Sequence, residues 1–181
     1  MPHVIGIDPG QRGAIAVIED GELIAMYSMP LHPCKHTKDG GVGPCRSCRK
    51  SINESLLLDL LLVHSIKTPP LAVIVERQMS RSGQKGQFAI VDHHGWLRGV
   101  VVGMGWTLDN PRPAAWQKGA WEYISEEDRN HATLGAKKKS IKAAQVLFPT
   151  HDFIPEGCRV PHDGRTDAAC IARYGWLKYG R

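Results

Sequence analysis

The sequence predicts an α/β fold with a mixed sheet, from two kinds of strand pattern and a set of helical patterns. Apolar runs over 4–7 and 13–19 are followed by Asp20-Gly21 and a strand pattern over 22–28, which indicates a three-stranded antiparallel meander. The continuous apolar run over 71–75 is typical of a strand that is buried on both faces in parallel pairing. Helical spacing of apolar residues follows at four places, 51–66, 87–102, 137–148 and 163–178.

The ends of the first helix and the shorter elements follow from local signals. Ser51 is the expected N-cap of this helix, with Glu54 three places on, and Thr68-Pro69-Pro70 ends it. We expect a short last strand at 106–108, a short helix or turn at 113–121 and a polar connection at 126–133.

Length and composition favour one domain over 1–181 with an insertion at 29–50. The chain has 181 residues and 42% hydrophobic content, enough for one sizeable core, whereas 29–50 has no core-forming pattern. The first residues show no signal pattern and no apolar run is long enough to span a bilayer, so we expect a cytoplasmic protein. The net charge of +5 suits a polyanionic partner without identifying one.

Four acids are placed at the ends of core elements. Asp8 and Glu76 end two predicted strands, and Asp163 and Asp167 stand one turn apart at the start of the last helix. Clustered carboxylates raise one another's pKa unless divalent cations neutralise them, and oxygen ligands of this kind select Mg²⁺ or Mn²⁺. A pair of such ions is suited to attack by water on a phosphodiester. Alternatively, Asp8 caps an Asx turn, Glu76 forms a salt bridge, and Asp163 and Asp167 are favourable first-turn acids.

The order and spacing of these motifs resemble those of the RuvC-like Holliday junction resolvases. The resemblance rests on Ile5-Gly6-Ile7-Asp8-Pro9-Gly10, Val73-Ile74-Val75-Glu76 and Asp163-Gly164-Arg165-Thr166-Asp167-Ala168, with Trp116-Gln117 and Lys137-Lys138-Lys139-Ser140 between them. It implies a ribonuclease H-like fold, a five-stranded mixed sheet flanked by helices. It also implies a crossover junction endodeoxyribonuclease that works as a two-fold homodimer and cuts four-way DNA junctions with Mg²⁺ or Mn²⁺.

By the same resemblance, Asp8, Glu76 and Asp167 match the metal-binding, catalytic acids, and Asp163 is the fourth. Bacterial members usually carry that fourth acid three residues before the last one, where this chain has Gly164. The spacing of Asp163 is similar to that of the viral and phage branch. We therefore expect the protein in the cytoplasm of a bacterium, or in that of a host cell infected by a virus or phage.

Basic residues beside these motifs are the expected phosphate contacts, because neutralising phosphates releases counterions. They are Arg77, Arg81, Lys85, Lys137, Lys138, Lys139 and Lys142. The lysines open a helix, where they oppose its dipole, although a solvated lysine face is the alternative. Met79 stands where bacterial members carry a phenylalanine that wedges into the junction, and its alternative is a methionine folded over the core.

Glycines at four-residue spacing mark one face of the helix at 87–102. Gly95, Gly99 and Gly103 permit the close approach of another backbone, from a neighbouring element or from a second subunit. With the symmetry of a four-way junction, this surface leads us to expect a homodimer.

The insertion carries three of the five cysteines within fifteen residues. Cys34, His36, Cys45 and Cys48 form a Cys₃His set that suits structural Zn²⁺, with His32 as an alternative to His36. The other interpretation is a flexible basic loop with incidental thiols. Cys158 and Cys170 are expected to be structural, with Cys170 facing the core.

Other functions use similar acids. A nuclease acting on RNA:DNA hybrids would use the same acids on a related sheet, and a catalytically silent junction-binding protein is a further possibility. A sugar-kinase or actin-like ATPase would need a second large domain, for which 181 residues leave no room.

Overall fold

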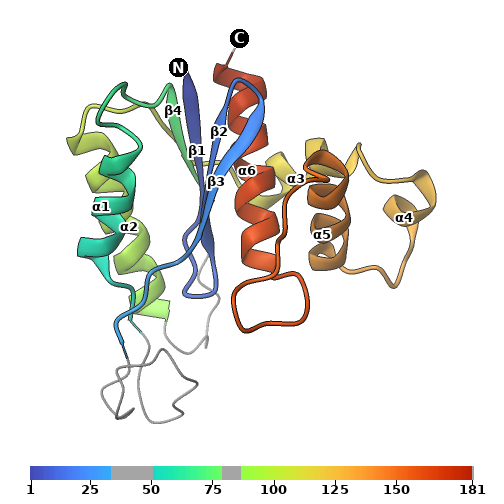
Figure 1. Cartoon of the computed structure of the whole chain (residues 1–181). Helices are drawn as coiled ribbons and strands as arrows, with labels where there is room; N and C mark the ends of the chain where they lie inside the picture. The colour runs from blue at the N-terminus through green and yellow to red at the C-terminus, as the bar shows by residue number, and fades with distance from the viewer. Residues whose placement is uncertain (34–50, 79–86, 181) are drawn as a thin grey trace.

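The computed structural model describes residues 1–33, 51–78 and 87–180, and its centre is a five-stranded sheet (Figure 1). The strands are β1 (His3–Asp8), β2 (Ala14–Glu19), β3 (Glu22–Ser28), β4 (Ala72–Val75) and β5 (Leu108–Asp109). Their order in the sheet is β3-β2-β1-β4-β5. β1, β2 and β3 pair antiparallel, whereas β4 pairs parallel with both β1 and β5. The expected meander, the parallel strand and the mixed five-stranded sheet are therefore confirmed.

Helices cover both faces of the sheet, and each face has its own apolar core (Figure 1). The helices are α1 (Glu54–Val63), α2 (Gln87–Gly103), α3 (Pro113–Trp121), α4 (Glu126–Asn130), α5 (Ala136–Leu147) and α6 (Asp163–Tyr179). On one face α1 and α2 cover Ile5, Ile7 and Val73, with Leu57 and Leu97 fully buried between them and the sheet. On the other face α6 lies on the sheet and α3 and α5 pack outside it.

Alternate residues of β1 therefore point into two different cores, which explains why this short strand is apolar from Val4 to Ile7. Burial of such side chains on both faces is the main favourable term for the fold, at about 1.5–3 kcal/mol for each large one. β1 is the central strand of the sheet and has a neighbouring strand on each side, so pairing on both sides fixes the place of its last residue, Asp8.

The contact between α6 and β1 is close because Gly6 has no side chain. A Cβ at Gly6 would lie 2.3 Å from the backbone nitrogen of Ala172 and 2.7 Å from the carbonyl oxygen of Ala168. The two backbones meet directly at this point, which is the usual reason for glycine in a buried strand. As a result, this contact fixes the position of α6 along the length of β1.

Three local expectations are wrong in detail. The N-cap of α1 is Asn53, whose side chain accepts from the Leu56 N–H at 3.1 Å, and not Ser51. The last strand lies at 108–109 and not at 106–108, and the Thr107 carbonyl just before it accepts from the Val73 N–H at 2.8 Å. Residues 126–130 form the short helix α4, capped by the Ser125 hydroxyl, where we expected only polar connection.

Within the ranges that the structure describes, no helix is long and apolar enough to cross a membrane. Cys170 is buried in α6 as expected, whereas Cys158 is exposed. The expected zinc ligands Cys34, His36, Cys45 and Cys48 lie outside the described residues, as do Met79, Arg81 and Lys85.

Candidate active site

Asp8 and Glu76 end two neighbouring parallel strands, so their carboxylates belong to the same edge of the sheet. β1 and β4 pair in register from Val4 to Ile7, and the Glu76 N–H continues the ladder by donating to the Ile7 carbonyl at 3.0 Å. Glu76 therefore follows β4 directly beside the residue that precedes Asp8.

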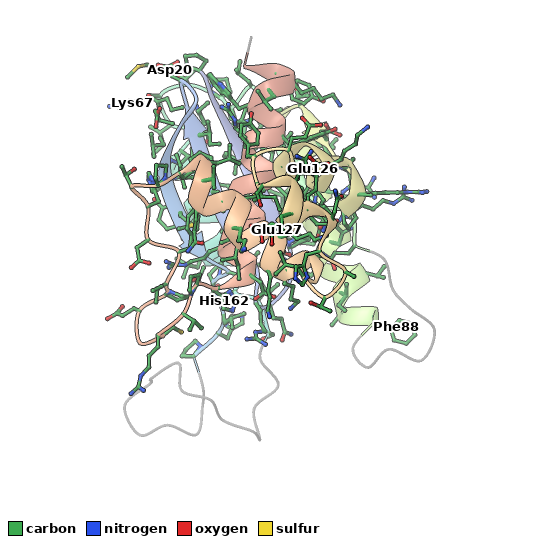
Figure 2. The ribbon with its side chains drawn as sticks, turned by 90° about the vertical axis from the view of Figure 1, so that its right-hand side faces the viewer. Asp20, Lys67, Phe88, Glu126, Glu127 and His162 are labelled. Atoms are coloured by element: carbon green, nitrogen blue, oxygen red, sulfur yellow. The ribbon has the colours of Figure 1, made fainter. Side chains whose placement is uncertain are left out.

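The first turn of α6 reaches this edge because Gly164 packs against the loop between β1 and β2. A Cβ at Gly164 would lie 2.0 Å from the Arg12 carbonyl oxygen and 2.8 Å from the Cα of Gly13. Only glycine allows this approach, and it brings Asp163 and Asp167, which flank Gly164 in α6, to the loop that follows Asp8. Figure 2 shows His162, just before α6, near the end of the molecule opposite Asp20 and Lys67.

Specific donors hold two of the four acids. The Gly10 N–H donates to Asp8 Oδ1 at 3.2 Å, which is the Asx turn that was the alternative reading of Asp8. The buried Trp116 indole donates Nε1–H to Glu76 Oε1 at 3.0 Å, and Gln78 donates to Glu76 Oε2 at 3.3 Å. Glu76 therefore has one preferred orientation, fixed from α3.

The two acids of α6 have opposite surroundings. Asp163 is partly exposed and forms an ion pair and hydrogen bond with Lys137 at the start of α5. Asp167 is largely buried, and its Oδ1 has no hydrogen-bond partner among the described residues. A buried carboxylate oxygen without a partner is costly, so this atom requires a cation, a donor or a proton.

The pKa values of three acids show that they interact. Burial, with the charge of Asp163 added, raises the pKa of Asp8 to about 6. Burial and the charge of Asp8 raise the pKa of Glu76 to about 7. Burial, then Asp8 and Glu76, raise the pKa of Asp167 to about 8. Partial burial of Asp163 raises its pKa, but the bond to Lys137 and the charges of Lys137 and Arg12 together outweigh burial and lower the pKa.

The chemistry of this donor set fits a hard divalent cation. All four groups are carboxylates, the pKa of three of them is raised, and one buried oxygen is unpaired, which is the state expected of oxygen ligands without their ion. Among the described residues, however, no three His, Cys, Asp or Glu side chains already stand close enough to hold a metal ion. The acids are gathered at one edge of the sheet, but they do not form a closed ligand set.

The structure divides the expected DNA-contacting lysines. Lys139 donates to the Arg129 carbonyl at 2.5 Å and lies over the Trp121 ring, and Lys142 pairs with Asp128. These two side chains link α4 to α5, and contact of Lys139 and Lys142 with phosphate stays a prediction. Lys138 and Arg77 are exposed, and Lys137 lies beside Asp163.

Three side chains at this edge have contacts that the sequence did not predict. Trp116 belongs to the motif set, but its bond to Glu76 was not predicted, because it joins residues 40 positions apart. Arg12 and His162 are neighbours of Asp163, and His162 Nδ1 lies 3.9 Å from Asp163 Oδ1. The sequence offered one signal for His162, which is that it is a polar residue directly before the last helix.

The chain is an α/β protein with a mixed five-stranded sheet of the ribonuclease H-like fold. Carboxylates stand at the ends of two adjoining parallel strands and at the start of a helix that packs on them. Among solved structures, the chain is similar to RuvC of Thermus thermophilus in complex with a Holliday junction substrate. The TM-score is 0.56 at 15% identity, over 99% of this chain and 97% of that one. A second Thermus thermophilus RuvC structure gives a TM-score of 0.53 at 16% identity, over 98% and 96%.

No family model matches the chain, and no curated protein matches it. The likeness at this identity is therefore one of fold. It confirms that the chain has the fold of RuvC, which the sequence motifs led us to expect.

Proposed function

We propose that this protein is a DNA endonuclease that resolves four-way junctions by metal-dependent hydrolysis of phosphodiester bonds. One observation carries the proposal: acids from β1, β4 and α6 gather at one edge of the sheet, and three of them have a raised pKa. The likeness to a RuvC that was solved with Holliday junction DNA supports the choice of substrate. The net charge of +5 suits a DNA partner.

Asp8, Glu76 and Asp167 would hold Mg²⁺ or Mn²⁺, two ions for each site, and Asp163 would join them when Lys137 is displaced. The ions would neutralise the acids and assist in-line attack of water on the scissile phosphate. The chain itself orients Glu76 through Trp116 and Asp8 through the Gly10 N–H. Because cation binding must release the protons that these acids hold, cation affinity should rise with pH between about 6 and 8.

Basic side chains near the acids would meet the DNA backbone. Arg77 directly follows Glu76, and Lys138 is exposed at the start of α5. Lys137 is close enough to Asp163 to exchange that carboxylate for a phosphate. Each such contact adds affinity through counterion release, without reading sequence.

The test is cleavage of a synthetic four-way junction with and without Mg²⁺, beside an RNA:DNA hybrid and a linear duplex of the same sequence. We expect cleavage of the junction only, at symmetric positions. Asp8→Asn, Glu76→Gln and Asp167→Asn should each remove most cleavage and keep junction binding, and Asp163→Asn should reduce it. Asp59→Asn, which changes an exposed acid on α1, is the matched control. Preferred cleavage of the hybrid would point to a ribonuclease H, and binding without cleavage to a silent junction binder.

We further propose that the protein is a two-fold homodimer through the outer face of α2. This face exposes large apolar side chains, with Phe88 84%, Val91 55% and Val102 62% exposed. Between them, a Cβ at Gly95 or Gly99 would meet no described atom within 4 Å. The neighbouring element that the glycines could have served is therefore not in the described part of the chain, which supports a second copy as the partner.

Sedimentation of the purified protein at micromolar concentration should show a dimer, and Gly99→Arg should shift it toward monomer. Gly119→Arg, at an open glycine on α3, is the control and should leave the dimer intact. A monomer with full junction cleavage would overturn the dimer while leaving the nuclease assignment untouched.

A further inference from the structure

The backbone at the end of β4 is held by polar side chains from outside the sheet. β5 pairs only with Val73 and Ile74 of β4, so the regular ladder on that side stops before Glu76. In its place, the Asn110 side chain donates Nδ2–H to the Val75 carbonyl at 2.6 Å. The Arg77 N–H donates to the Pro111 carbonyl at 2.8 Å. The segment after β5 therefore forms hydrogen bonds with the backbone on both sides of Glu76.

His94 completes this arrangement from α2. Its Nε2 lies 3.1 Å from the same Asn110 Nδ2, and its ring also forms a hydrogen bond with the backbone of Glu76. The amide of Asn110 has two hydrogens, one for the Val75 carbonyl and one for His94 Nε2. His94 Nε2 is then an acceptor, which leaves the other ring nitrogen as the donor toward Glu76.

Only 9% of His94 is exposed, so its ring nitrogens must find their partners within the protein. Burying a polar ring costs free energy unless its nitrogens form hydrogen bonds, and leucine would fill the same space without that cost. The bonds of the ring to Asn110 and to the backbone of Glu76 therefore point to a specific role for His94. The neighbouring His93 has similar burial but faces elsewhere, with Nδ1 3.9 Å from Glu54 on α1.

We propose that His94 and Asn110 are positioning residues, which set the place of the Glu76 carboxylate by holding the backbone on either side of its Cα. Trp116 and Gln78 orient the carboxylate itself, and the His94–Asn110 pair locates the strand end that carries it. The inference deepens the proposed function, since it rests on Glu76 being a ligand of the divalent cation. It also joins Glu76 to α2, the helix whose outer face we assign to the dimer.

The test compares His94→Leu and Asn110→Ala with His93→Leu as the matched control. Mn²⁺ binding is measured by calorimetry in the absence of DNA, and junction cleavage is measured under single-turnover conditions across a range of Mg²⁺ concentrations. We expect His94→Leu and Asn110→Ala to weaken Mn²⁺ binding about 10-fold or more, since residues that orient a ligand typically contribute 10- to 100-fold. Cleavage at low Mg²⁺ should fall in parallel, while junction affinity without metal stays within about twofold.

His94→Gln is the rescue variant, because its amide can still accept from Asn110 and donate to the Glu76 backbone. It should recover most of the lost Mn²⁺ affinity, which a merely space-filling role for the ring would not predict. If His94→Leu does not fold, Asn110→Ala and His94→Gln decide the matter.

Equal Mn²⁺ affinity in wild type, His94→Leu and Asn110→Ala would overturn the inference, and so would an equal loss in His93→Leu. If the wild-type protein binds Mn²⁺ but cuts no junction, the proposed function fails, while positioning of Glu76 is still judged on Mn²⁺ binding alone. If the wild type binds no Mn²⁺, this inference fails with the metal assignment.

Discussion

Replacing Asp167 by asparagine should make the protein more stable while it removes activity. The Asp167 carboxylate is buried beside Asp8 and Glu76, and its Oδ1 has no partner among the described residues. Asparagine has nearly the same shape but carries no charge and needs no proton. In the absence of metal, the substitution therefore removes a destabilising group.

The magnitude follows from the pKa. Burial first, then Asp8, raises the pKa of Asp167 from 3.8 to about 8. The folded state therefore binds more protons than the unfolded state between these values, so the stability that the protonated group contributes is full below pH 4 and is lost as pH rises toward 8. At pH 7 the loss is about 4 kcal/mol, at 1.36 kcal/mol for each pH unit. Relaxation and water entry offset part of it, so we expect about 2 kcal/mol of stabilisation by Asp167→Asn.

Calorimetric melting in EDTA at several pH values measures this effect. For a chain of this length, about 2 kcal/mol corresponds to about 4–8 °C at pH 7 to 8, with the gain shrinking toward zero near pH 4. Added Mg²⁺ should reverse the order, since it stabilises the wild type more than the variant. Asp59→Asn should show neither effect. A variant that melts at or below the wild-type temperature at pH 8 in EDTA would refute the reasoning.

Three further predictions concern other parts of the chain. Gly164→Ala should lower stability by about 1–3 kcal/mol and impair Mn²⁺ binding, because its Cβ would meet the Arg12 carbonyl, whereas Gly119→Ala, in open space on α3, should not; equal melting temperatures would contradict this. Asn53→Ala should cost about 1 kcal/mol in chemical denaturation and Ser51→Ala much less, and the reverse order would restore Ser51 as the cap. Elemental analysis should find about one zinc per chain, lost in Cys45→Ser with Cys48→Ser, and protein that takes up no zinc when reduced would leave 29–50 as a basic linker.

The acids could be placed from the sequence because their strands are unambiguous. β1 and β4 are short apolar runs that end on a single carboxylate before a turn, and the helical spacing of α6 puts Asp163 and Asp167 on one side. Parallel pairing of β1 with β4 then brings Asp8 and Glu76 to one edge. Such local patterns can be read from the sequence because a strand that is buried on both faces is apolar between its ends.

The cap of α1 could not be read in this way. Ser51 has the right chemistry and the right spacing to Glu54, but its carbonyl accepts from the His32 N–H at 3.0 Å, and Ile52 forms a bridge with Leu31. These contacts with a distant segment hold Ser51 in extended backbone and delay the helix by two residues. The sequence alone does not show which of two candidate capping residues will be held by backbone hydrogen bonds to another segment of the chain.

The lysines of α5 show the same limit for charge. A run of like charges predicts an electrostatic surface, but it does not reveal which members already have partners. α4 was invisible to apolar periodicity because none of its residues is buried. Its acids nevertheless give Lys142 a partner in Asp128, and its last turn gives Lys139 a carbonyl at Arg129. The partners of these two lysines therefore depend on a helix that the sequence pattern did not reveal.

Gly164 relates one difference between this sequence and the bacterial resolvase pattern to the geometry of the candidate site. That pattern has an acid at this position, yet here the backbone of α6 lies so close to Arg12 and Gly13 that no side chain can be accommodated. The close approach is also what carries Asp167 into the buried corner beside Asp8, where its pKa is raised. Asp163 lies one residue earlier, partly exposed, where Lys137 can reach it. Moving the acid by one position thus keeps a fourth carboxylate at the edge of the site, while it lets the helix descend onto the loop that follows Asp8.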